Sequence, residues 1–159
     1  MNFKRFLLLM TFVLSAQLPA LAQVERVAMR TMQMSCGVCA VFSEIYLKQL
    51  GTIDKISISK SKEAIMITYK PGASFQPSAI RAALKKTEVG VAQFQIGARG
   101  QVQQEGGKQF LLAGKDKFLL VLEPDSPKVP VGLVSIEGVV NDNANPMEMR
   151  VMTVKPIAK

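Results

Sequence analysis

The sequence contains no histidine and only two cysteines among its 159 residues. Histidine is the commonest general base in enzymes, and the chain also has no paired carboxylates, no Ser/His/Asp set and no phosphate-binding loop. We therefore predict that the protein is not an enzyme. A structural zinc site needs four ligands, mostly Cys or His. Two cysteines alone do not complete such a site within one chain.

Long apolar runs are absent after the first 22 residues. Within those residues, Lys4 and Arg5 form a basic start, residues 6–14 form an apolar core, and residues 20–22 read Ala-Leu-Ala. This pattern is typical of a cleavable secretory signal peptide, and it is too short for a membrane span. We predict a periplasmic or secreted protein with no stable membrane insertion. No cysteine lies at the cleavage point, which argues against a lipoprotein anchor.

The chain has fewer acidic residues than basic ones. Removal of Lys4 and Arg5 with the signal lowers the count of Lys and Arg from 20 to 18, against 12 Asp and Glu, so the net charge becomes +6. These basic residues are scattered, and Lys85-Lys86 is the only adjacent pair left. The charge predicts a general attraction to anionic surfaces, and we predict no nucleic-acid partner.

The two cysteines lie in one short stretch, residues 34–39, which reads Met-Ser-Cys-Gly-Val-Cys. It follows an alternating strand pattern and precedes an apolar helical pattern, and a helix N-terminus favours the thiolate form of cysteine. Thiolates select soft or borderline ions such as Cu(I), Zn(II) and Hg(II). Cys36 and Cys39 are therefore the candidate metal ligands. Cu(I) is the favoured ion because two thiolates suffice for it, with Hg(II) and Zn(II) as alternatives.

Export leaves other interpretations of the cysteine pair open, because disulfides persist in oxidising compartments. A bridge between cysteines three positions apart closes a very small loop and adds little stability, so a functional pair fits better than a structural staple. The alternative to a metal-binding protein is an envelope adaptor without metal, whose Cys-x-x-Cys is a disulfide or a redox pair.

Periodicity predicts two helices among four strands in the first part of the chain. The expected order is a strand at 24–32, a helix at 38–50, strands at 53–59 and 64–69, a helix from 76 or 77 to about 87, and a strand at 89–96. The first helix carries a broad apolar arc, which comprises Val38, Val41, Phe42, Ile45, Leu47 and Leu50. This βαββαβ order is the split βαβ, or ferredoxin-like, arrangement.

A βαββαβ chain with Met-x-Cys-x-x-Cys between its first strand and first helix resembles the heavy-metal-associated domain. That domain occurs in copper chaperones, in metal-transporting ATPases and in the periplasmic mercuric-ion binding protein, and the resemblance covers about residues 24–96. It implies that Cys36 and Cys39 bind the metal on an exposed loop and that Met34 packs beneath that loop. It also implies a periplasmic protein that buffers a soft metal ion or transfers it to a metal-transporting or envelope protein.

Beyond an expected break at residues 97–100, the sequence predicts only short strands. They are expected at 101–104, 109–113, 118–122, 133–140 and 149–154, and the first of them can continue directly from the strand before the break. The ending is similar to that of OB-type barrels, which bind oligonucleotides or sugars, but only Phe110 and Phe118 offer stacking aromatics in these strands. We predict an α+β protein: a ferredoxin-like βαββαβ domain at residues 23–97, followed by a small all-β, OB-like barrel at residues 98–159.

Cleavage after Ala22 should leave Gln23 as the first residue of the mature protein. Intact-mass measurement of the exported fraction from expressing cells checks this directly. A full-length product embedded in the membrane would contradict the predicted export.

Overall fold

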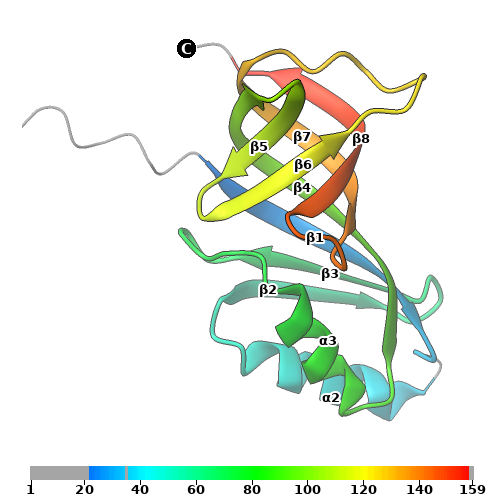
Figure 1. Cartoon of the computed structure of the whole chain (residues 1–159). Helices are drawn as coiled ribbons and strands as arrows, with labels where there is room; N and C mark the ends of the chain where they lie inside the picture. The colour runs from blue at the N-terminus through cyan, green and yellow to red at the C-terminus, as the bar shows by residue number, and fades with distance from the viewer. Residues whose placement is uncertain (1–21, 35, 158–159) are drawn as a thin grey trace, which may run out of the picture.

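The computed structural model describes residues 22–34 and 36–157, so the predicted signal peptide at residues 1–22 lies outside the described residues except for Ala22. The elements along the chain (Figure 1) are β1 (Gln23–Met32), α2 (Gly37–Lys48), β2 (Ile53–Ser59), β3 (Ala64–Tyr69), α3 (Pro77–Lys85), β4 (Gly90–Glu105), β5 (Lys108–Ala113), β6 (Asp116–Val121), β7 (Gly132–Asn141) and β8 (Met147–Pro156).

All eight strands belong to one sheet, in the order β2-β3-β1-β4-β5-β6-β8-β7. A further pairing between β4 and β7 closes the last five strands into a ring. Helices α2 and α3 pack against each other beneath the β2-β3-β1-β4 part of the sheet, at the end of the molecule away from the ring (Figure 1). Neither of the two helices in the described part of the chain has the length and apolar character needed to cross a membrane.

The predicted fold class, a ferredoxin-like domain followed by a separate OB-like barrel, is wrong. Strand β4 is 16 residues long, and it pairs with β1 along Gly90–Arg99, with β7 along Phe94–Val102 and with β5 beyond residue 100. The expected boundary between residues 97 and 98 therefore lies inside a strand. The helical half and the ring share β4 and form one continuous sheet.

Two glycines account for the difference. Gly97 and Gly100 were expected to break the chain, yet both are buried inside β4. A Cβ at Gly100 would collide with the carbonyl oxygen of Leu112 on β5, and one at Gly97 would lie 2.9 Å from Nε of Arg26 on β1. Glycine within a strand can mark the close approach of a neighbouring strand as well as a turn. Here the glycines let β4 fit tightly between its partners.

An aromatic cluster fills the junction between the helical half and the ring. Phe75, just before α3, meets Phe94 of β4 edge to face with ring centroids 5.4 Å apart, and its ring lies 6.4 Å from that of Phe118 on β6. All three side chains are at most 4% exposed. The backbone N–H of Phe75 also donates to Oδ2 of the buried Asp116 at 2.8 Å. One hydrophobic core thus extends from the helices into the ring.

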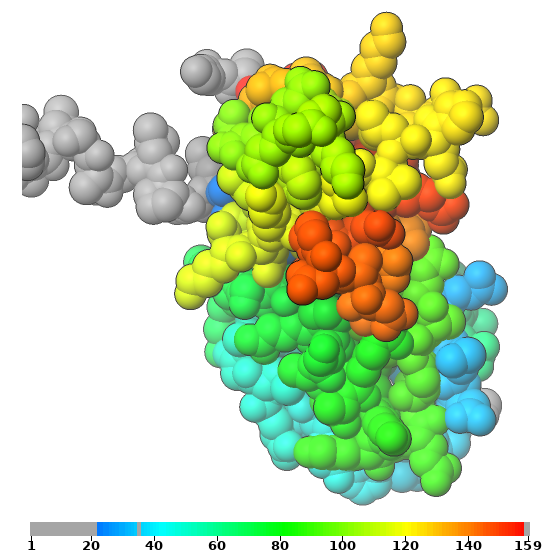
Figure 2. Space-filling model, in the orientation of Figure 1, coloured from blue at the N-terminus to red at the C-terminus, as the bar shows by residue number. Residues whose placement is uncertain are grey.

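A bidentate ion pair makes a second connection between the two halves. Nε and Nη2 of Arg81 on α3 donate to the two carboxylate oxygens of Asp142, in the loop between β7 and β8, at 2.7 and 2.8 Å. The same guanidinium donates to the carbonyl of Val91 at 2.7 Å and lies 4.8 Å from the centre of the Phe94 ring. Figure 2 shows this loop, in orange, against α3, in green. The hydrogen bonds from Arg81 hold the pKa of Asp142 below its usual range.

Replacing Asp142 by Asn should lower the free energy of unfolding at pH 7 by about 1–2 kcal/mol, because a charge-assisted pair with a partly exposed arginine is lost. The depressed pKa makes this contribution complete above the ordinary aspartate pKa of about 3.9. It is lost as the pH falls through the lower value in the folded state. Urea unfolding at several pH values should therefore show the two proteins converging in acid.

Asp125→Asn is the matched control for this substitution. Asp125 is exposed in the loop between β6 and β7, so its replacement removes the same charge without the bidentate pair. An equal loss of stability in both variants would show that net charge, and not the Arg81 contact, is responsible.

Candidate functional site

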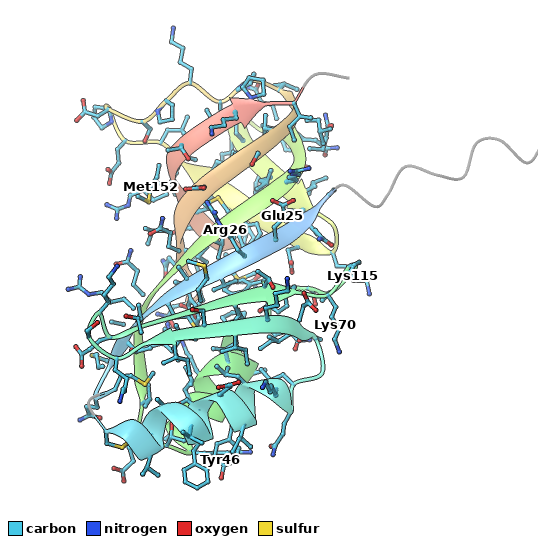
Figure 3. All side chains as sticks on the ribbon, turned by 180° about the vertical axis from the view of Figure 1, so that it is seen from behind. Glu25, Arg26, Tyr46, Lys70, Lys115 and Met152 are labelled. Atoms are coloured by element: carbon cyan, nitrogen blue, oxygen red, sulfur yellow. A yellow bond between two sulfur atoms is a disulfide. The ribbon has the colours of Figure 1, made fainter. Side chains whose placement is uncertain are left out.

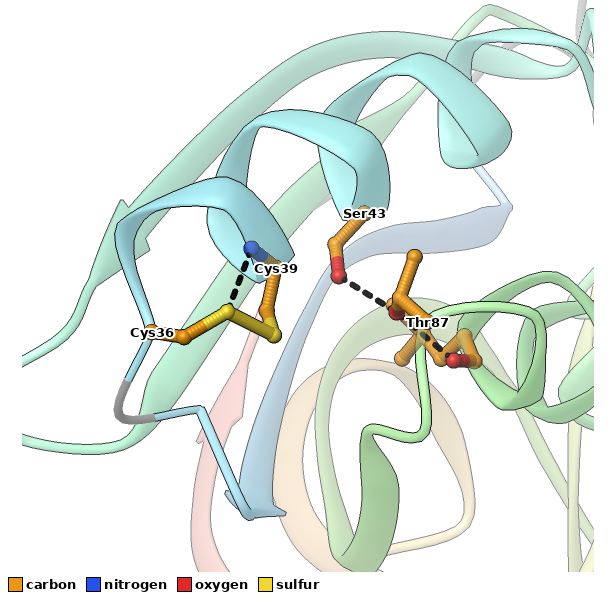
Figure 4. The surroundings of a disulfide bond; sticks show 5 residues. Cys36, Cys39, Ser43 and Thr87 are labelled. Carbon is orange, nitrogen blue, oxygen red and sulfur yellow. Dashed lines mark hydrogen bonds between the residues drawn. A yellow bond between two sulfur atoms is a disulfide. The ribbon is translucent and has the colours of Figure 1, made fainter.

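The two predicted ligands, Cys36 and Cys39, lie together at the start of α2. Cys36 is the N-cap residue, with extended backbone angles of φ −87° and ψ 139°, and Cys39 lies in the first turn. Their Cα atoms are 5.2 Å apart and their sulfur atoms form a disulfide (Figure 4). The backbone N–H of Cys39 donates to Sγ of Cys36 at 2.9 Å. The sulfur of Cys36 thus takes the place of the side-chain oxygen that usually caps a helix.

The surroundings of this first turn favour negative charge on sulfur. The free N–H groups of a helix N-terminus carry partial positive charge, and α2 has no acidic residue in its first turn. The ammonium group of Lys60, from the turn between β2 and β3, lies beside Gly37, 3.7 Å from where a Cβ would stand. After reduction, the Cys39 N–H, the helix end and Lys60 would all stabilise a thiolate at Cys36.

The sulfur-containing side chains of this region differ in how exposed they are to solvent. Cys36 is exposed, Cys39 is half-buried against the core, and Met34 is fully buried at 0% exposure. A buried Met34 fits the packing role that the resemblance implies for it. Cys36 is therefore the sulfur that a molecule arriving from solvent reaches first.

Among the described residues, no others are placed to complete a metal centre around the pair. Within residues 22–34 and 36–157, no group of three or more His, Cys, Asp or Glu side chains is placed to hold an ion. A four-ligand zinc site is therefore not formed by the described part of one chain. What these residues offer a metal ion is a pair of sulfur donors on an exposed helical turn.

Helix α2 buries only part of the apolar arc that the sequence places on it. It buries Ser43 and Leu47, and the Oγ of Ser43 is hydrogen-bonded to Oγ1 of Thr87 at 3.0 Å (Figure 4). Thr87 in turn donates to the carbonyl of Leu84 at 2.8 Å, so these polar groups are satisfied beneath the helix.

Four apolar side chains of α2 face solvent as a result. They are Val38, Val41, Phe42 and Ile45, which are 63%, 59%, 47% and 44% exposed, and we refer to them as the α2 stripe. Periodicity identifies the helix but does not say which part of a wide arc is covered, so the sequence does not predict this surface. Ser43 on the opposite side gives no usable signal, because its partner Thr87 is known only from the structure.

No protein-family model matches the chain, and a search of curated proteins returns no match. The resemblance to the heavy-metal-associated domain rests on the Met-x-Cys-x-x-Cys motif and on the order of the elements around it. What it implies for the metal and the partner stays a prediction.

Reduced protein should react unevenly with a small alkylating agent such as iodoacetamide. Cys36 is exposed and its sulfur accepts the Cys39 N–H, so we expect it to be modified several-fold faster than the half-buried Cys39. Brief labelling at neutral pH, followed by peptide mass spectrometry, measures both rates in one sample. Equal rates, or faster modification of Cys39, would contradict this account of the turn.

Proposed function

We propose that the protein binds a soft metal ion, best suited to Cu(I), between Cys36 and Cys39 and buffers or transfers it in the periplasm. The observation that carries the proposal is the position of both sulfur atoms on one exposed helical turn, close enough to bond to each other. Atoms at that separation can reach a single ion with little movement of the backbone. Two thiolates satisfy the low coordination number of Cu(I).

The disulfide is the form that cannot bind metal, so a reductant must act first. An external dithiol would supply two electrons and two protons to convert the disulfide into two thiols. Binding of the ion would then release the two thiol protons, because only thiolates are ligands. Metal loading would thus depend on both the redox state of the compartment and its pH.

Transfer to a partner would proceed by thiolate exchange. An incoming thiolate from a metal-transporting or envelope protein would bind the ion first, and one cysteine of this chain would then leave. The exposure of Cys36 makes it the sulfur nearest to such a partner. The half-buried Cys39 would hold the ion while the exchange begins.

A second candidate is an envelope adaptor that binds no metal and keeps its cysteines as a disulfide or redox pair. The Cys36–Cys39 bond is compatible with it, because this bond occupies both sulfur atoms. The exposed α2 stripe beside the bond is also the kind of surface an adaptor would use. Metal binding by the reduced protein distinguishes the two candidates.

Single substitutions at the pair should remove tight binding. We expect Cys36→Ser and Cys39→Ser each to weaken Cu(I) binding by about a hundredfold or more, because one of two strong sulfur bonds is lost. Competition with a coloured Cu(I) chelator measures the affinity of the reduced proteins. Serine is itself a good N-cap, so Cys36→Ser should leave α2 folded.

Met34→Leu is the matched control, since it changes the third sulfur-containing residue of the motif at nearly constant volume. Buried Met34 should tolerate it at a cost below about 1.5 kcal/mol in stability and with no loss of Cu(I) affinity. If this substitution weakened binding as much as the loss of a cysteine, the thioether would be a ligand. Wild-type protein that fails to compete for Cu(I), Hg(II) or Zn(II) would leave the adaptor as the better account.

A further inference from the structure

The α2 stripe is an apolar surface that the described fold leaves uncovered. Its members stand at positions i, i+3, i+4 and i+7 of one helix, and each is at least 44% exposed. The apolar surface extends from the stripe to Tyr46, whose ring is stacked with that of Phe42 at a centroid distance of 6.4 Å. Figure 3 shows Tyr46 on the outer side of α2, directed away from the sheet. Contiguous exposed apolar side chains of this kind mark an interaction surface.

Within residues 22–34 and 36–157, no segment covers the stripe. The first strand begins at Gln23, which pairs with Arg99, and the last strand ends at Pro156, which pairs with Val134 in the ring. Both ends of the described chain lie far from α2, at the other end of the molecule (Figure 1). The described part of the chain thus leaves the stripe open to another molecule.

Basic side chains border the stripe on both sides. Lys86 places its ammonium 4.9 Å from the centre of the Tyr46 ring on one side, and Lys60 lies beside Gly37 on the other. The one acidic residue of α2, Glu44, is paired with Lys48 at 2.6 Å. The charge pattern therefore favours an anionic occupant.

The convex shape of the surface suits a lipid occupant. The stripe lies on a convex helix in the outermost layer of the molecule (Figure 1). A lipid surface accepts a convex apolar face directly, and a protein partner is an alternative that the experiment below distinguishes. Helices that lie on membranes combine an apolar face with lysines at its border, whose ammonium groups reach the headgroups.

We propose that the α2 stripe and its lysine border adsorb the mature protein reversibly to a membrane surface rich in anionic phospholipid. The disulfide turn at the start of the same helix would then lie at the lipid surface. This proposal does not depend on metal binding, because the stripe is exposed while Cys36 and Cys39 are joined.

Co-sedimentation of the oxidised mature protein with vesicles tests the proposal. One set of vesicles contains equimolar phosphatidylglycerol and phosphatidylcholine, and the other contains phosphatidylcholine alone. We expect binding to the anionic vesicles that weakens as NaCl is added, and little binding to the neutral ones. Lys60→Gln should weaken binding to the anionic vesicles by about fivefold.

A second set of variants, with substitutions within the stripe, tests the same proposal. Phe42→Ser combined with Ile45→Ser should weaken vesicle binding by at least about tenfold, because two apolar side chains no longer enter the lipid. Val38→Ser and Val131→Ser form a matched pair, since both valines are 63% exposed but Val131 lies outside the stripe. Only the first should reduce binding. Thermal unfolding of each variant confirms that it is folded.

Three results would overturn the proposal. They are absence of binding to the anionic vesicles, equal binding of the stripe variants and the wild type, and a dimer in sedimentation that Phe42→Ser dissociates. Such a dimer would mean that a second copy of the chain covers the stripe. Absence of binding to the anionic vesicles would instead point to an acidic protein partner. Failure of this test leaves the proposed metal site untouched, because the assay uses the oxidised protein.

Discussion

Strand β4 is the constraint on which the rest of the structure depends. Among the described residues it is the only strand that pairs with three others. Its residues 90–99 pair with β1 in the part of the sheet that the helices cover, residues 94–102 pair with β7, and the residues from 101 onward pair with β5. Removing either half of β4 would leave rows of backbone N–H and C=O groups without partners. The helical half and the ring are thus held in a fixed relation.

That fixed relation positions the cysteine turn. Helix α2 packs on β2 and α3, and Ser43 is hydrogen-bonded to Thr87 just after α3, which is tied to the ring by Arg81 and Asp142. A rigid support of this kind presents the first turn of α2, with Cys36 outermost, to solvent. It also presents the α2 stripe on the same helix. A sulfur pair and an apolar surface therefore share one short element.

Local patterns in the sequence predict most of the elements but not how they combine. Alternation and helical spacing locate β2, β3 and both helices, and Pro77 marks the start of α3 as expected for a first helical position. The sequence allows one strand to continue past residues 97–100 but does not show that Gly97 and Gly100 lie inside it, because the partners that crowd those glycines come from β1 and β5. Long-range pairing determines whether a glycine ends a strand or admits a close neighbour.

In the candidate site, too, the sequence predicts the local feature but not the one that depends on long-range contacts. The spacing of Cys36 and Cys39 suffices to bring the two sulfur atoms together, since a helical turn does so wherever it lies. Exposure of the α2 stripe depends on which side of α2 meets the sheet, and that follows from Thr87, more than forty residues away in the chain. Sequence periodicity carries no information on such a contact.

Native mass spectrometry of the reduced mature protein during Cu(I) titration tests the central claim most directly. The account predicts one ion bound per chain, and none after the cysteines are reoxidised to the disulfide. A reduced protein that takes up no Cu(I), and likewise no Hg(II) or Zn(II), would contradict it.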